Sequence, residues 1–211
     1  MALDRETFRA ALVARHGADR QAKFDAARVA VCGLGGLGSN VSIALARAGV
    51  GHLHLIDFDR VEPSNLNRQQ YTAAQVGLPK AEALRANLAA INPFCEVTAE
   101  TVRVTDANLA ALLADDDIVC EAFDRAEAKA MLVSGVLETF PEKPVVAASG
   151  MSGLASANAI ATKRISKRLY LCGDGTTDVN DGIGLYGARV LVCAAHQATM
   201  ILRLIDGADE P

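Results

Sequence analysis

The sequence predicts an α/β fold, in which a mostly parallel sheet carries helices on both faces. Short apolar runs alternate along the chain with helical patterns of about 10–15 residues. A glycine-rich turn joins the first apolar run to a helix, and two later apolar runs end in an acidic residue. Because parallel strands need a crossover connection, usually a helix, this alternation favours a parallel sheet.

The elements follow in order along the chain. We expect helices over 4–15, 40–50, 80–92, 106–114, 125–140 and 185–205, and strands over 28–33, 52–57, 95–100, 117–124 and 144–150. Phe8, Leu12 and Val13 give the first helix a partial apolar stripe, and Gly51 ends the second helix. Pro79 fits the first turn of the third helix.

The character of the chain changes after Gly150. Residues 162–172 alternate like one strand with a basic edge, and residues 173–184 have the composition of a loop. There is no internal repeat and no linker, so we expect a single domain over 1–211. Its nucleotide-binding core would cover 28–150, and 151–211 would form an extension for carrier docking and dimerisation.

Composition excludes several classes of protein. The chain of 211 residues is 51% hydrophobic and 22% charged, which excludes a disordered chain, and its net charge of −4 makes nucleic-acid binding unlikely. The charged N-terminus has no apolar signal core, and the last helix is too short and too interrupted by polar residues for a membrane span. We therefore expect a soluble cytoplasmic protein without a membrane partner.

Five cysteines are scattered without a pair at CxxC spacing, which speaks against a zinc site and against a disulfide framework. Cys32, Cys120 and Cys193 lie in apolar runs and are expected to be small buried side chains.

The glycine loop Gly33-Leu-Gly35-Gly36-Leu-Gly38 follows an apolar strand and opens a helix. Without Cβ atoms the backbone can turn tightly, and the amide groups at the helix N-terminus favour an anion such as a phosphate. The alternative is a tight turn without a ligand.

Two acids follow the second strand. Asp57 ends it, about 20 residues past the loop, where ribose hydroxyls would arrive. Asp59 stands two residues later, and two close carboxylates repel each other unless a cation or hydrogen-bond donors compensate. A solvated turn is the alternative, but the polar run 64–69 after it favours an ordered site.

The segments "GLGGLGS", "IDFDRVEPSNLNRQ", "GLPKAEAL" and "EAFDRAEAK", in this order, resemble the E1-like activating enzymes of the ThiF/MoeB/HesA superfamily. The chain is most similar to the short ThiF-type proteins of thiamine biosynthesis, which adenylate the sulfur carrier ThiS. The resemblance covers residues 28 to about 150. It implies a Rossmann-like sheet, a crossover loop and an antiparallel extension at the C-terminal end.

The resemblance also implies a reaction. The family uses ATP and Mg²⁺ to activate the C-terminal glycine carboxylate of a ubiquitin-like carrier that ends in Gly-Gly. The carboxylate attacks the α-phosphate, pyrophosphate leaves, and an acyl-adenylate remains. The family forms homodimers, so a homodimer is implied here too.

Site residues are implied position by position. The family pattern places the glycine loop against the nucleotide, Asp57 on the ribose, a polar group at the phosphate end and two cations on the phosphates. The residues that match this pattern are Gly33, Gly35, Gly36, Gly38, Asp57, Asp59, Ser64, Asn65, Asn67, Arg68 and Lys80. Asp124 matches the acid associated with Mg²⁺. The alternatives are an exposed first-turn lysine at Lys80, a simple pairing of Arg68 with Asp59, and a helix-capping role for Asp124.

The sequence departs from the family pattern in three places. Relatives often carry an N-terminal arginine that reaches the partner subunit's ATP; Arg9 is our choice here, with Arg15 and Arg20 as rivals. Many relatives hold a structural zinc, which this chain cannot. Some use a cysteine in the crossover loop for a covalent link to the carrier, and Cys172 is the candidate, with an inert cysteine as the alternative.

Other functions stay open at this point. They are activation of a molybdopterin carrier or of a tRNA nucleoside carboxylate, an NAD-dependent oxidoreductase on the same fold, and a nucleotide-binding partner protein without catalysis. The basic cluster 163–168 is either a solvated strand edge or a surface that docks an acidic carrier.

Overall fold

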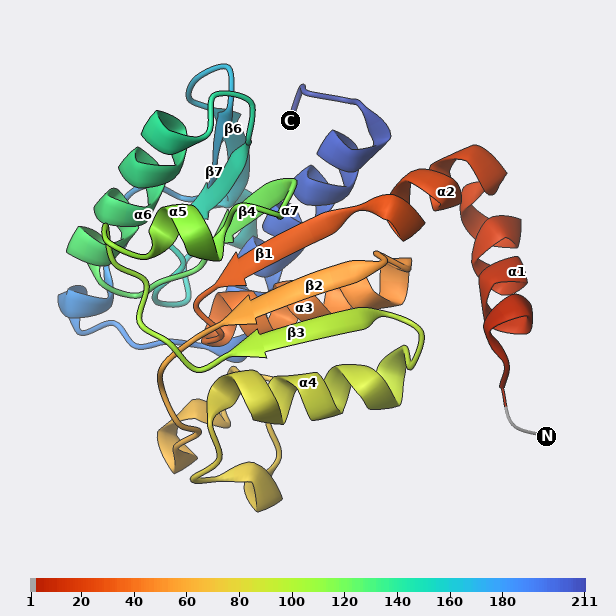
Figure 1. The fold of residues 1–211 in the computed structure, drawn as a ribbon. Helices are drawn as coiled ribbons and strands as arrows, with labels where there is room; N and C mark the ends of the chain where they lie inside the picture. The colour runs from red at the N-terminus through yellow and green to blue at the C-terminus, as the bar shows by residue number, and fades with distance from the viewer. Residues whose placement is uncertain (1–2) are drawn as a thin grey trace.

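The computed structural model describes residues 3–211 (Figure 1). The helices are α1 Arg5–His16, α2 Ala18–Ala26, α3 Gly36–Ala48, α4 Lys80–Ile91, α5 Leu109–Leu112, α6 Ala126–Thr139 and α7 Gly187–Asp206. The strands are β1 Arg28–Cys32, β2 His52–Ile56, β3 Glu96–Glu100, β4 Ile118–Glu121, β5 Val145–Ala148, β6 Ala161–Arg164 and β7 Leu169–Gly173.

The strands form one seven-stranded sheet in the order β3-β2-β1-β4-β5-β7-β6. Neighbours from β3 to β7 pair in parallel, and β6 pairs antiparallel with β7. The chain order reverses between β1 and β4, which makes their carboxyl ends the switch point where open sheets bind ligands. The predicted Rossmann-like sheet with an antiparallel C-terminal extension is confirmed.

Helices cover both faces of this sheet, as Figure 1 shows. Side chains alternate along β1, with Val29 and Val31 on one face and Ala30 and Cys32 on the other. The first face packs against α3, α4 and α7, and the second packs against α5 and α6. The two cores fix the strand ends that carry the polar residues described below.

Three expected elements differ from the structure. A second helix, α2, follows α1 after Gly17, whose φ of 84° lets the chain turn. The helix expected over 106–114 is a single turn, α5, because the side chain of Asn108 holds the Thr105 amide in a turn just before it. The single strand expected over 162–172 is the hairpin of β6 and β7.

Two of the four residues in the basic cluster have partners inside the chain. Arg164 pairs with Asp209 and Glu210. Arg168 donates to carbonyls at the C-terminal end of α6, including those of Leu137 and Phe140, which a helix leaves unpaired. Two of the four basic side chains are therefore held within the chain, and the charge of one of them, Arg164, is paired with acids.

On length and composition alone, the 20-residue helix α7 could span a membrane. In this fold α7 packs along α3 and against the sheet. Its residues Cys193, Ala194, Ala198 and Ile201 are buried in the larger core. The helix is therefore part of the core of the fold.

Candidate functional site

A cavity of about 600 Å³ lies at the carboxyl ends of β1, β2, β4 and β5. Its walls are the segments that follow these strands, together with parts of 60–69, Lys80, 102–104 and 177–179. This is the switch point of the sheet.

The glycines of the loop have two different roles. Gly33 has a φ of 91°, and a Cβ there would lie 2.7 Å from the carbonyl oxygen of Ala122. A Cβ on Gly38 would lie 1.8 Å from the Gly33 oxygen, so both glycines are required by the close packing of the turn. Gly35 is different: its Cβ would meet nothing nearer than Gln69 Nε2 at 3.8 Å, and it lines the cavity. The backbone at Gly35 is therefore open to a ligand.

The N-terminus of α3 faces this cavity. Gly35 is its N-cap, and within residues 3–211 no side chain caps it. Gly36 and Leu37 of the first turn line the cavity, and first-turn amides have no partner within their own helix. Together with the helix dipole, they form a site suited to an anion.

Asp57 ties the glycine loop to the turn after β2. Its Oδ2 accepts from the Leu34 amide and its Oδ1 from the Asp59 amide, both at 2.7 Å. Burial raises the pKa of Asp57, and the Lys80 ammonium group opposes that shift. Each oxygen keeps a further lone pair, so the carboxylate can still accept from a ligand hydroxyl.

Lys80 pairs with Asp59 at the other side of this turn. Its Nζ lies 3.0 Å from Asp59 Oδ2, and its amide donates to the Asp59 carbonyl at 2.9 Å. The lysine is 7% exposed, so the alternative of an ordinary exposed first-turn lysine is wrong. The pair brings a cation into the cavity wall and compensates one of the two acids.

Arg68 lies across the glycine loop. Its Cγ would be 3.4 Å from a Cβ on Gly36, and its Nη1 donates to the Ser64 carbonyl at 3.0 Å and to Asn67 Oδ1 at 2.9 Å. Because Asp59 pairs with Lys80, the alternative of a simple Arg68–Asp59 pair is wrong. Partial burial lowers the pKa of Arg68, and the nearby Asp124 carboxylate opposes that shift.

Among the other polar residues near Arg68, some line the cavity and one supports a lining side chain. Ser64 and Asn65 line the cavity, and Asn65 Oδ1 holds the Glu62 amide at 3.0 Å. Asn67 is not among the lining residues, because its side chain donates to the Leu185 carbonyl at 3.0 Å and accepts from Arg68. Asn67 therefore supports the Arg68 side chain through this hydrogen bond.

Asp124 lines the cavity in the bend between β4 and α6. The N-cap of α6 is Arg125, so the alternative of a helix-capping role for Asp124 is wrong. The described residues include no group of three candidate metal-binding side chains. Mg²⁺ often binds through one or two carboxylates plus substrate phosphates, and an exposed carboxylate beside an anion site fits that arrangement.

Arg9 lies far from this cavity. It is in α1, which packs with α2 near the end of the sheet where β1 to β3 begin (Figure 1). Its Nε is 2.6 Å from Asp25 Oδ2, and its side chain is half exposed. It cannot reach the cavity of its own chain, and its reach into a partner subunit stays a prediction.

Cys172 is not in a loop. It lies inside β7, is fully buried, and has a thiol pKa that burial raises to about 11. A nucleophilic cysteine needs access and a thiolate, so its position contradicts a covalent role. Cys32, Cys120 and Cys193 are buried as predicted.

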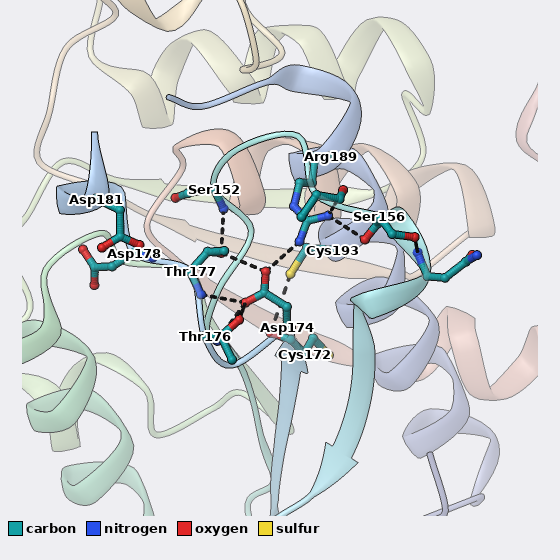
Figure 2. A network of polar contacts seen from close by, with 12 residues as sticks. Ser152, Ser156, Cys172, Asp174, Thr176, Thr177, Asp178, Asp181, Arg189 and Cys193 are labelled. Carbon is teal, nitrogen blue, oxygen red and sulfur yellow. Dashed lines mark hydrogen bonds and ion pairs between the residues drawn. The ribbon is translucent and has the colours of Figure 1, made fainter. Parts of the chain in front are cut away.

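The sequence did not predict two ion pairs near the cavity, of whose four residues only Lys129 lines it. Glu121, the last residue of β4, pairs with Lys129, and Asp174 pairs with Arg189 (Figure 2). For the Glu121–Lys129 pair, the sequence offered one signal, an acid inside the apolar run 117–124. Nothing in the local pattern connects Asp174 with Arg189.

Comparisons with known proteins agree with this geometry. The ThiF family model matches residues 8–211. The chain is 44% identical to the molybdopterin-synthase adenylyltransferase of Escherichia coli over 118 residues, which cover 56% of this chain and 47% of that protein. It is 33% identical to the adenylyltransferase and sulfurtransferase MOCS3 of Culex quinquefasciatus over 92% of this chain and 45% of that one. The chain thus spans about half the length of these relatives.

Among solved structures, the E. coli tRNA N6-threonylcarbamoyladenosine dehydratase TcdA, in complex with ATP, superposes with a TM-score of 0.86. The sequence identity is 25%, and the match covers 98% of each chain. The chain belongs to the ThiF family, within the E1-like ThiF/MoeB superfamily.

Proposed function

We propose that this protein uses ATP to adenylate the C-terminal glycine carboxylate of a ubiquitin-like sulfur carrier of the ThiS type, in thiamine biosynthesis and in the cytoplasm. One observation carries the proposal: the open N-terminus of α3, Arg68, Lys80 and Asp124 converge on a single cavity. A triphosphate and an incoming carboxylate are both anions, and such a reaction needs this concentration of donors.

Each residue has a chemical task in the reaction. Asp57 accepts from the ribose, and the amides of α3 receive phosphate oxygens. The carboxylate oxygen bonds to the α-phosphorus, and the bond to the β-phosphate bridge breaks to release pyrophosphate. Arg68 and Lys80 stabilise the charge that develops on that leaving group.

Mg²⁺, held by Asp124 and the phosphates, would neutralise further charge on the triphosphate. Lys80 exchanges its present partner, Asp59, for phosphate oxygens, since both are anionic acceptors. A strong charge-assisted bond therefore replaces an existing one, and the lysine is held in place beforehand.

The partner carrier approaches the wall made of 149–152 and 177–179. In a homodimer, Arg9 of one subunit would complete the ATP site of the other. A Gly-Gly tail has no side chains, so it would enter this cavity more readily than a bulky tail.

Two alternatives rest on the relatives. The molybdopterin-synthase adenylyltransferase favours a molybdopterin carrier, and the shape match to the tRNA-modifying dehydratase favours a tRNA substrate. The net charge of −4 argues against a large nucleic acid, and two cations at the phosphate end argue against NAD chemistry.

Pyrophosphate exchange into ATP tests the proposal. We expect exchange that needs a carrier with a free C-terminal glycine, and that is fastest with a ThiS-like carrier. A carrier without its last two residues is the matched control. Exchange with a molybdopterin carrier alone would reassign the substrate, and a melting shift with NAD but not with MgATP would overturn the activity.

A further inference from the structure

The two strands that flank β1, β2 and β4, deliver their acids to the cavity in the same way. Asp57 follows β2 and accepts the amide of Asp59, two residues on, at 2.7 Å. Glu121 ends β4 and accepts the amide of Phe123, also two residues on, at 2.7 Å. In each case a buried carboxylate fixes the turn that presents the next acid, Asp59 in one and Asp124 in the other.

Each of these turns has its own lysine. Lys80 holds Asp59, and Lys129 holds Glu121, with its Nζ at 3.0 and 2.9 Å from the two carboxylate oxygens. Lys129 also donates to the Ala148 carbonyl at 2.9 Å. Its three N–H donors therefore all point at the ends of β4 and β5, and the side chain lines the cavity.

A residue of α7 also holds Glu121, through its backbone. Gln197 of α7 donates to the Glu121 carbonyl at 2.9 Å and to the Val146 carbonyl at 3.2 Å. Glu121 is 1% exposed, and burial raises its pKa while Lys129 lowers it. A buried ion pair rarely adds net stability, so stability alone does not account for this one.

We propose that Glu121 and Lys129 are positioning residues that hold the Phe123–Asp124 turn, and thereby place Asp124 beside Arg68 for the metal of MgATP. The inference rests on the proposed function, since that function assigns the metal to Asp124. Neither residue needs to touch the nucleotide. Lys129 acts through Glu121, and Glu121 acts through the amide of Phe123.

The test compares Lys129→Met with Lys143→Met. Lys143 is the matched control, a largely buried lysine that donates to the carbonyls of Leu113 and Ala114 away from the cavity. Calorimetry with ATP measures affinity with Mg²⁺ and with a chelator. We expect Lys129→Met to reduce the Mg²⁺ enhancement of affinity about tenfold, as one lost charge-assisted contact would. Lys143→Met should retain it.

Amide hydrogen exchange gives a readout that does not depend on activity. Lys129→Met should exchange the Phe123 amide at least about tenfold faster than the unmodified protein, while the Asp59 amide keeps its rate. Glu121→Gln keeps an oxygen for that amide, so it should retain protection within about threefold. If Lys129→Met does not fold, Glu121→Ala serves as the second variant, because it removes the acceptor of the Phe123 amide and should speed the exchange of that amide in the same way.

A double variant separates a positioning role from a general loss of Mg²⁺-dependent binding. Lys129→Met added to Asp124→Ala should change Mg²⁺ dependence no further, and Lys129→Arg should restore much of it. Additive losses, or an unchanged Mg²⁺ enhancement in Lys129→Met, would overturn the inference. If MgATP binding follows these expectations but no carrier supports pyrophosphate exchange, the proposed function fails and the positioning role stands.

Discussion

The Asp174 carboxylate and the Arg189 guanidinium form a buried ion pair, with Oδ2 and Nη2 at 2.6 Å and each side chain 3% exposed. It ties the end of β7 to the first turn of α7. Asp174 also accepts from the amides of Thr176 and Thr177, and Arg189 donates to the Ser156 carbonyl (Figure 2). The pair therefore fastens the wall of the cavity that the incoming tail would meet.

Asp174→Asn should destabilise the protein by about 3 kcal/mol at pH 7, because it leaves Arg189 buried without a counter-charge. The hydrogen bonds hold the pKa of Asp174 well below its ordinary 3.8. The native aspartate thus adds stability above that value and loses it as pH falls below it. In urea unfolding, the difference in the free energy of unfolding between the native protein and the variant should become smaller below about pH 4.

Asp206→Asn is the control for that measurement. Asp206 pairs with Arg20 and Lys23 at the surface, where such pairs contribute about 0–1 kcal/mol. If Asp174→Asn lowers the free energy of unfolding by an equally small amount, or by an amount that does not depend on pH, the role assigned to the Asp174–Arg189 pair is contradicted.

Replacement of Gly35 and Gly38 by alanine should give opposite results. Gly38→Ala forces a Cβ to within 1.8 Å of a backbone oxygen and should cost stability by about 3 kcal/mol or more. Gly35→Ala meets no atom closer than 3.8 Å, so it should fold but bind ATP about tenfold more weakly. Thermal melting and calorimetry measure the two effects, and tight ATP binding by Gly35→Ala would exclude the loop as the phosphate site.

Arg68→Ala and Lys80→Met should each lower carrier-dependent pyrophosphate exchange about 100-fold, because each removes a donor to the developing charge. Arg85→Ala is the control, since this exposed arginine pairs with Glu82 on the outside of α4. Wild-type exchange rates in both site variants would remove the proposed electrostatic role.

Arg9→Ala should lower exchange if the arginine serves the partner subunit. Mixed dimers of Arg9→Ala with Arg68→Ala subunits should regain activity, up to about a quarter of wild type, because each mixed dimer holds one intact site. Arg85→Ala, on the outside of α4, is the control variant. No recovery on mixing, with dimers shown to exchange, would argue against a role across subunits.

Cys172 should be unreactive in the folded protein. It is buried and its thiol pKa is raised to about 11, so native labelling with iodoacetamide should leave it unmodified. Incubation with carrier and ATP should give no reducible adduct in mass spectrometry. An adduct that Cys172→Ser abolishes would show that β7 opens during the reaction.

The core of the fold and the glycine loop could be predicted because their patterns are local. Glycine spacing, the strand before it and the helix after it lie within 28–48, and Asp57 follows at the edge of the next strand. The sheet order then places them together without further information.

Long-range contacts decided what the sequence did not predict. The pairing of Lys80 with Asp59 depends on the path of the chain between them, and Arg168 finds its role at the end of a helix that precedes it by more than one strand. The burial of Cys172 depends on the pairing of β7 with β5 on one side and with β6 on the other, and the sequence around Cys172 shows neither pairing. Such pairings become visible once the chain has folded.

A structure with Mg²⁺ and a non-hydrolysable ATP analogue tests the central claim most directly. The account predicts that Arg68 and Lys80 both lie within about 3 Å of phosphate oxygens, with the triphosphate at the N-terminus of α3 and the metal against Asp124. A nucleotide whose phosphates point away from both cations, with Lys80 still paired to Asp59, would contradict it.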